Sequence, residues 1–177
     1  MGTIKPSPKA HPFVAVMFKN KKDLSACLEY LQEQLGDAFP GGPIYRVTDF
    51  TKYYVKEFGE LLLKQFFVFR KPVNLEDFYQ IKIQTNNFEL GKLGSSKRIL
   101  NIDPGYLEPS KLVLFSTKNF SHRIYCGKGI YAEVTMTYAH DEFVRLPWTY
   151  NDYYWGKNRS FLKKIRDEIV CLSRSQL

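Results

Sequence analysis

The residues with the clearest chemical potential lie between Lys97 and Tyr138, where basic side chains follow a β-strand pattern. His122, Arg123 and Glu133 fall on two arms of a predicted hairpin, joined by Gly127-Lys128-Gly129. A carboxylate at this place could act as a base beside a bound phosphate, and a neighbouring histidine could titrate near neutral pH. We therefore take His122 and Glu133 as candidate catalytic residues.

The hairpin has two possible registers, which differ in the residues that share a face. Residues 130–138 alternate between apolar and polar or aromatic side chains, as in a half-buried strand. A two-residue turn places Arg123 opposite Ala132, whereas a three-residue loop places Ile124 opposite Ala132 and Arg123 opposite Glu133. Only the second register places apolar residues opposite apolar residues and charged residues opposite charged residues. It predicts a cross-strand ion pair, which is more often a weak structural contact than a functional one.

The favoured register also gathers a candidate ligand site on one face of the hairpin. Tyr125 and Tyr131 would lie side by side on this face. The expected ligand-binding residues are Lys111, Lys118, Arg123, Tyr125, Tyr131 and Thr135. The aromatic segments 50–54 and 147–150 would close the rim of a concave site. These residues favour a phosphorylated small molecule or nucleotide as ligand, with hydrolase or transferase chemistry as an option.

Charge supports an anionic partner but leaves its class open. The chain carries a formal net charge of +8. Residues 91–128 hold seven Lys and Arg against Asp103 and Glu108, a net of +5. Phosphate, nucleotide and nucleic acid all fit this bias, and so does a solubilising face. An RNA- or DNA-binding module and a non-catalytic structural or interaction protein are therefore the alternatives. The pocket is favoured over nucleic acid, because Glu133 would repel a nucleic-acid backbone.

Length and composition predict one domain of the α+β class. The chain has 177 residues, of which 44% are hydrophobic, enough for a single core. Residues 1–11 are expected to form a flexible tail and residues 12–177 the domain. No apolar run could span a bilayer and no hydrophobic leader is seen, which favours the cytoplasm. Cys27, Cys126 and Cys171 are far apart, as in a reducing compartment. No motif indicates a metal or identifies a cofactor.

Periodicity predicts the order β-α-β-β-α-β, the ferredoxin-like arrangement, followed by antiparallel strands and a C-terminal helix. Asn20 is the expected cap of the first helix, which ends at Gly36, and Asn74 the expected cap of the second long helix. Asp103-Pro104-Gly105 predicts a turn. The expected strands cover residues 12–18, 44–47, 64–71, 97–102, 111–116, 122–126, 129–138 and 142–146.

Six segments in a fixed order carry a resemblance to a known family. They are Phe50-Thr-x-Tyr-Tyr-x-x-Glu-x-Gly59, Asn101-Ile-Asp-Pro-Gly-Tyr-Leu107, Lys111-Leu-Val-Leu114, Ser121-His-Arg-Ile-Tyr125, Gly129-Ile-Tyr-Ala-Glu-Val-Thr135 and Pro147-Trp-Thr-Tyr150. Together they resemble a mainly bacterial family defined as domain of unknown function 4416, over nearly the whole chain. The resemblance implies a single-domain protein and transfers no activity or catalytic residue.

Overall fold

The computed structural model describes residues 2–76, 78–92 and 98–174. Its strands are β1 (Lys9–Phe18), β2 (Tyr45–Arg46), β3 (Leu63–Val68), β4 (Val73–Asn74), β5 (Leu100–Glu108), β6 (Lys111–Ser116), β7 (Ile124–Gly127), β8 (Ile130–Ala139) and β9 (Glu142–Arg145). Its helices are α1 (Lys21–Leu35), α2 (Val55–Phe58), α3 (Tyr79–Gly91) and α4 (Gly156–Arg174), with a 3-10 turn at Val47–Asp49.

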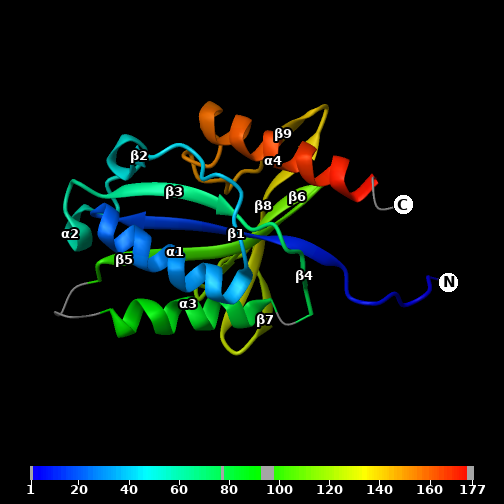
Figure 1. Ribbon diagram of the computed structural model, residues 1–177, viewed down its shortest axis with the longest axis horizontal. Coiled ribbons are helices and arrows are strands. Elements are labelled where there is room, and N and C mark those ends of the chain that lie inside the picture. Colours follow the sequence, from blue (N-terminus) through cyan, green and yellow to red (C-terminus); the bar gives the residue numbers. More distant parts are fainter. Residues whose placement is uncertain (1, 77, 93–97, 175–177) are drawn as a thin grey trace.

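Within the described residues, the strands form one sheet in the order β2-β3-β1-β5-β6-β8-β7. Every recorded pairing is antiparallel, and β4 and β9 add short pairings to β1 and β8. Figure 1 shows β1, β3 and β5 side by side, with β6 and β8 crossing them at a steep angle. The result is a mixed helix-and-strand domain with one antiparallel sheet and a C-terminal helix.

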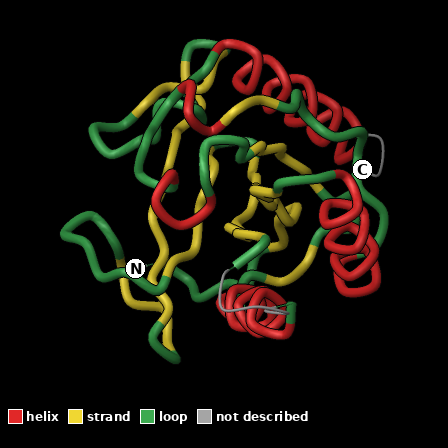
Figure 2. Tube along the Cα trace, turned by 90° about the vertical axis from the view of Figure 1, so that its left-hand side faces the viewer, coloured by secondary structure: helices red, strands yellow, loops and turns green. Residues whose placement is uncertain are grey.

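Helices cover both faces of the sheet, as Figure 2 shows from the side. Helix α1 presents Leu24, Cys27, Leu31 and Leu35 to a core that includes Val14, Val16, Phe18 and Ile102. Helix α3 covers the same face farther along, over Val113 and Phe115. Helix α4 closes the opposite face with Leu162, Ile165 and Ile169 against Phe13, Phe66 and Leu114. Burying apolar residues at helical and strand spacing on these contacts supplies the main stabilisation.

The ends of α1 follow the predicted capping pattern. The Asn20 side chain accepts a hydrogen bond from the Asp23 amide at 2.9 Å, which satisfies one of the free N–H groups of the first turn. Gly36 follows the last residue of the helix with a φ of 81°, a value that glycine adopts without strain. Both predictions are confirmed.

The sheet opens between β5 and β6, and this opening positions the site. Residues Gly105 to Glu108 of β5 pair with β6, starting from the pair Gly105–Leu114. Residues 100–104 of β5 pair only with β1, while Phe115 and Ser116 of β6 pair only with β8. The two halves of the sheet therefore diverge beyond Gly105.

The turn predicted at Asp103-Pro104-Gly105 is wrong, because these residues continue β5 through to Glu108. Pro104 lies opposite Val14 of β1, and the pairing of β5 with β6 begins only at the next residue, Gly105. The N–H group that proline lacks would therefore point to the side from which β6 has already separated, and no ladder hydrogen bond is lost. A Cβ atom built on Gly105 would lie 2.0 Å from the carbonyl oxygen of Val113. Glycine is therefore needed there for close strand approach rather than for a turn.

Three other element boundaries differ from prediction. Strand β1 begins at Lys9 instead of residue 12, because Lys9 and Ala10 pair with β4. Asn74 belongs to β4 and does not cap α3, which begins at Tyr79 after an intervening turn. Strand β3 ends at Val68, whereas the predicted strand extends to residue 71. Residues 77 and 93–97, which include the first residue of the strand predicted at 97–102, lie outside the described residues.

The register predicted for the β7–β8 hairpin is confirmed, although its loop differs. Ile124 lies opposite Ala132, and Tyr125 opposite Tyr131. Lys128 and Gly129 form a two-residue connection with positive φ angles, and a register shift beside Cys126 supplies the extra residue. A bulge in β7, and not a three-residue loop, therefore produces the register in which Ile124 lies opposite Ala132.

Strand β8 does not keep one apolar face along its whole length. Its pairing with β6 shifts by one residue, so that Val113 faces Val134 while Leu112 faces Met136. Thr135 is the extra residue, and the faces exchange there. Residues before it, such as Ile130, pack toward α3, while Met136 packs toward α4. The single alternation predicted over residues 130–138 is therefore wrong beyond Val134.

Within residues 2–76, 78–92 and 98–174, no helix combines the length and the apolar character needed to cross a bilayer.

Candidate functional site

A cleft of about 810 Å³ lies where β5 and β6 diverge. Residues from both halves of the sheet line it, among them Asp103 from β5 and Ser116 from β6. Lys82 and Asn86 also line it, from helix α3 on the sheet face that α1 covers as well. The volume is in the range of small-molecule sites.

Aromatic side chains surround the mouth of the cleft. They come from the segment before α2, the loop after β6 and the segment after β9: Phe50, Tyr53, Tyr54, Phe120, Trp148 and Tyr150. The two segments predicted to close the rim, 50–54 and 147–150, thus both reach the cleft. Burial raises the pKa of the Tyr54 and Tyr150 hydroxyls, so both remain protonated donors at neutral pH.

Charged side chains of both signs line the same cleft. The cations are Lys64, Lys82, Arg98, Lys118, Arg123 and Arg145, and the anions are Glu57, Asp103, Glu133 and Asp152. Four of the cations form ion pairs with these four anions. Replacing a buried ion pair by apolar residues is often neutral or stabilising, so several such pairs in one cleft are weak evidence for a purely structural role.

Glu133 and Arg123 form the most enclosed of these pairs. Arg123 Nε donates to Glu133 Oε2 at 2.6 Å, and the two side chains are only 3% and 2% exposed. The guanidinium also donates to the Ser116 hydroxyl, the Lys118 carbonyl and the Tyr150 hydroxyl. These bonds fix the Arg123 side chain between β6, β8 and the segment that follows β9.

His122 contacts the same carboxylate but is not itself part of the cleft lining. Its Nε2 lies 2.9 Å from Glu133 Oε2, and its ring stacks on Trp148 at 4.8 Å between centroids. Trp148 is held in turn by its indole N–H, which donates to the Val134 carbonyl at 2.7 Å. His122 therefore orients Glu133, while Glu133 is the member of the pair that reaches the cleft.

Lys82 and Asp103 form a second pair at the floor. Lys82 Nζ donates to the Ile102 carbonyl at 2.7 Å and lies 3.4 Å from Asp103 Oδ1. Asp103 Oδ2 accepts a bond from the Asn101 amide at 2.8 Å. The Lys82 side chain is 8% exposed, so a buried ammonium group from α3 reaches the edge of β5.

Lys64 and Asp152 form a third pair. Lys64 Nζ donates to Asp152 Oδ2 at 2.7 Å, and the hydroxyl of Tyr45 donates to the same oxygen at 2.8 Å. The ammonium group also lies 4.5 Å from the centre of the Tyr153 ring. Burial and the adjacent Asp152 carboxylate raise the pKa of Tyr45, which keeps its hydroxyl a donor.

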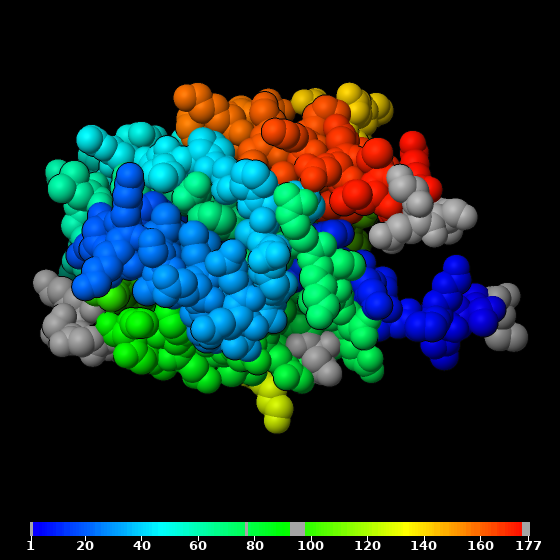
Figure 3. Space-filling model, in the orientation of Figure 1, coloured from blue at the N-terminus to red at the C-terminus, as the bar shows by residue number. Residues whose placement is uncertain are grey.

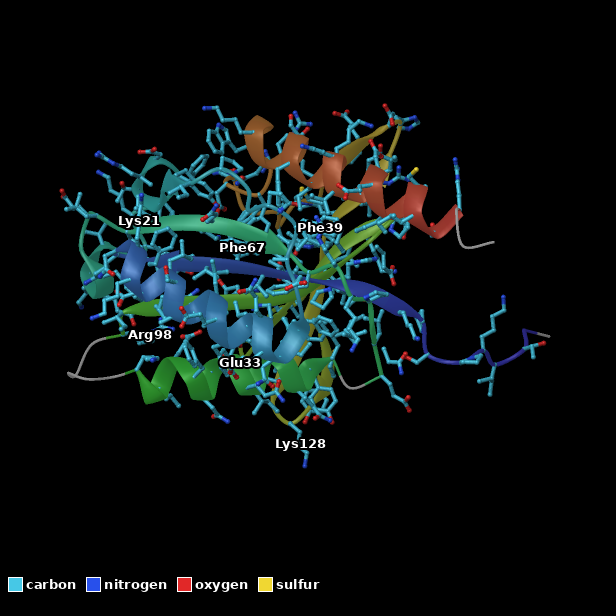
Figure 4. All side chains as sticks on the ribbon, viewed as in Figure 1. Lys21, Glu33, Phe39, Phe67, Arg98 and Lys128 are labelled. Carbon is cyan, nitrogen blue, oxygen red and sulfur yellow. The ribbon has the colours of Figure 1, made fainter. Side chains whose placement is uncertain are left out.

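Arg98, labelled near the start of β5 in Figure 4, lines the cleft and joins α2 to β5 through bonds to Glu57 and Asn101. It makes two hydrogen bonds to Glu57, at 2.6 and 3.1 Å, and one to Glu89 at 3.1 Å. The bonds from Arg98 lower the pKa of Glu57. Glu89 accepts from the Ile102 amide at 2.8 Å, yet burial raises its pKa. Arg98 and Glu57 therefore give the cleft a polar part of its wall.

Lys118 and Arg145 are the lining cations without a recorded acidic partner among the described residues. Lys118 Nζ lies 3.3 Å from the Tyr53 hydroxyl, and Arg145 makes a 3.5 Å contact with Asn151. Both residues are exposed at the mouth. Each also lies over a tyrosine ring, Lys118 over Tyr53 at 5.1 Å and Arg145 over Tyr154 at 5.2 Å, contacts that leave the positive charges unneutralised.

The structure brings together part of the predicted site. Arg123, Lys118 and Glu133 line the cleft. Thr135 is fully buried at the bulge, 3.4 Å from Glu133 Oε1, and supports that carboxylate. Tyr125 and Tyr131 contact each other as predicted, at 5.3 Å between centroids, but neither is part of the cleft lining.

Lys111 lies at the other end of β6, where it pairs with Glu108. The roles predicted for Lys111, Tyr125 and Tyr131 stay predictions, without support from the position of the cleft. The basic residues of segment 91–128 that the structure describes also do not converge. Lys128, for example, projects from the tip of the β7–β8 hairpin (Figure 4).

Sequence reasoning missed the two buried lysine pairs, Lys82–Asp103 and Lys64–Asp152. Lys64 lies two residues before Phe66, on the same buried face of β3, and Lys82 lies within the amphipathic pattern of α3. A lysine at a position where the pattern requires a buried side chain was the available signal. Within the described residues, no group of three His, Cys, Asp or Glu side chains could hold a metal ion.

Comparison with known protein families gives a match that covers most of the chain. Residues 8–168 match the family described as Domain of unknown function (DUF4416). The protein belongs to this family. No curated protein and no solved structure matches the chain. The site of this DUF4416 protein is therefore argued from its own geometry.

Proposed function

We propose that this DUF4416 protein binds a phosphorylated small molecule, such as a nucleotide or a sugar phosphate, in the cleft between β5 and β6. The observation that carries the proposal is the pair of exposed cations, Lys118 and Arg145, which line an aromatic-rimmed cleft and have no recorded acidic partner within the part of the chain that the structure describes. A phosphate there would receive charge-assisted hydrogen bonds from side chains that give up no buried ion pair.

Glu133 is the proposed proton acceptor if the bound molecule reacts. Its Oε2 atom is occupied by Arg123 and His122, while its Oε1 atom, as far as the described residues go, has a single recorded contact, with Thr135 at 3.4 Å. A carboxylate with one free oxygen could take a proton from a hydroxyl or a water, as a hydrolase or transferase requires. His122 would act through Glu133 as a positioning residue.

Nucleic-acid binding is the second candidate, and the geometry favours it less. Base stacking requires aromatic side chains on an accessible sheet or groove. Figure 3 shows α1 and α3 packed over the face of the sheet that it presents, and α4 covers the other face. Tyr125 on β7 is exposed and could stack on a base, but its exposed neighbour Ile124 is uncharged. The cations that could bind a phosphate backbone line the cleft, and Tyr125 does not. A purely structural role would leave the cleft empty.

The strand order β2-β3-β1-β5, with α1 and α3 as crossovers, supports a ferredoxin-like interpretation of the first half. In this proposal, β6 to β9 extend that core and create the cleft at the junction. The cytoplasm remains the proposed compartment, on the cysteine pattern of the sequence.

Titration calorimetry at low ionic strength tests the proposed function. The probes are AMP, ribose 5-phosphate and a ten-nucleotide single strand. We expect at least one small phosphate ester to bind, and we expect the double variant Lys118→Ala/Arg145→Ala to weaken it by roughly tenfold or more. Added salt should also weaken the binding, because both cations are exposed.

Lys128→Asn is the matched control, since Lys128 lies outside the cleft lining and asparagine tolerates its φ of 53°. This variant should bind as the wild type does. Equal losses in the control and the double variant would show only a general charge effect. Preferential binding of the oligonucleotide would favour the second candidate, and binding of no probe would contradict the proposal.

A further inference from the structure

The floor of the cleft differs chemically from its mouth. The mouth offers Lys118 and Arg145 as donors, whereas the floor offers Lys82–Asp103 and Lys64–Asp152, in which a buried ammonium group lies beside a carboxylate. The Lys64 and Lys82 side chains are 4% and 8% exposed. A ligand that fills the cleft therefore meets two chemical environments along its length.

Each floor pair has hydrogen-bonding capacity left for a ligand. An ammonium group has three donors, and Lys82 uses one in a short bond to the Ile102 carbonyl. Its contact with Asp103 Oδ1 is long, at 3.4 Å, so that oxygen can accept a further bond. In the other pair, both recorded bonds to Asp152 end on Oδ2, which leaves Oδ1 as the acceptor for a ligand.

A hydroxyl group complements such a pair. It donates one hydrogen bond and accepts others, so it can give its proton to the carboxylate and accept from the ammonium group. A phosphate dianion has no proton to give and would be repelled by Asp103 and Asp152. An apolar group would leave the buried charges without the water that it displaces.

We infer that the Lys82–Asp103 and Lys64–Asp152 pairs receive hydroxyl groups of the ligand, so that the cleft selects a phosphate ester of a polyhydroxylated, sugar-like group. The phosphate stays at the mouth with Lys118 and Arg145, and the hydroxyls point to the floor. The Tyr54 hydroxyl, also in the lining, adds a further donor. This inference rests on the proposed function, because the mouth must first hold the phosphate.

The test compares two probes of equal charge, ribose 5-phosphate and pentyl phosphate, by titration calorimetry on the full chain. We expect ribose 5-phosphate to bind the wild type roughly 10- to 100-fold more tightly, since hydrogen bonds to charged groups contribute strongly. Asp103→Asn should shrink that ratio toward one, because it removes the carboxylate acceptor for the ribose hydroxyl and does not weaken the binding of pentyl phosphate. Asp103 suits the substitution because its side chain is 29% exposed and asparagine keeps its shape.

Asp152→Asn is the second variant and should act in the same direction, with thermal unfolding recorded to confirm the fold. Asp141→Asn, on the β8–β9 turn and outside the cleft lining, is the control and should keep the full ratio. Equal binding of the two probes by the wild type would overturn this inference and leave the proposed function standing. A ratio that persists in Asp103→Asn would overturn the role of the Lys82–Asp103 pair. Failure of both probes to bind would overturn the inference together with the proposed function.

Discussion

Arg123 Nε and Glu133 Oε2 lie 2.6 Å apart on neighbouring segments of the β7–β8 hairpin, and both side chains are almost fully buried. The pair was predicted from the register of the hairpin, but as a contact on the sheet surface. Its burial changes its energetics, because a buried charge that loses its partner is costly, whereas an exposed pair contributes little.

Breaking this pair should destabilise the protein strongly. We expect Arg123→Met to lower the free energy of unfolding by about 3–5 kcal/mol, because Glu133 is left buried with one fewer donor. The double variant Arg123→Met/Glu133→Leu should lose less than the sum of the two single variants. Urea unfolding measures all four proteins. Additive losses would contradict direct coupling between the two side chains.

Gly105 should not tolerate a side chain. Gly105→Ala places a Cβ atom against the Val113 carbonyl oxygen, at the last pair before the sheet opens. We expect a loss of about 3 kcal/mol in the free energy of unfolding. Gly91→Ala is the control, since a Cβ there meets nothing within 4 Å, and its loss should be negligible. Similar stabilities of the two variants would show that β5 and β6 are farther apart than described.

His11 should make stability fall in mildly acidic solution. Its Nδ1 lies 3.0 Å from the Phe69 carbonyl oxygen, and burial lowers its pKa below 6.5 despite that bond. Because the unfolded chain binds the proton more readily, this contribution is present above pH 6.5 and is lost as the pH falls through the folded pKa. His11→Gln should flatten this part of the profile of unfolding free energy between pH 7 and 5. His140→Asn, at an exposed turn, should leave it in place; an unchanged profile in His11→Gln would contradict this origin.

Local features of the fold could be predicted from sequence because neighbouring residues decide them. The Asn20 cap, Gly36 and the strand alternation around Ile124 and Ala132 each involve contacts between residues that are close in sequence or joined by a tight connection. Such features depend on short-range geometry and on one buried face, so the sequence pattern is sufficient.

The cleft could not be predicted in the same way. The cleft depends on where β5 and β6 separate. This point is set by the bulge at Thr135 and by the close approach of Gly105 to Val113, and neither feature leaves a periodic signal in the sequence. Asp103 was interpreted as a turn residue because Asp-Pro-Gly favours turns locally, and tertiary pairing with β1 overrides that preference. Lys82 reaches Asp103 from helix α3, and only the packing of α3 on β5 brings these two side chains together.

The most direct test of the central claim is a map of amide chemical shifts by NMR during titration with ribose 5-phosphate. If the cleft between β5 and β6 is the binding site, the largest changes should fall on lining residues of different segments, such as Tyr53, Lys118 and Trp148. The changes should saturate at one ligand per chain and disappear in Lys118→Ala/Arg145→Ala. Changes confined to the exposed surface of α4 or to the tip of the β7–β8 hairpin, or no changes at all, would contradict the claim.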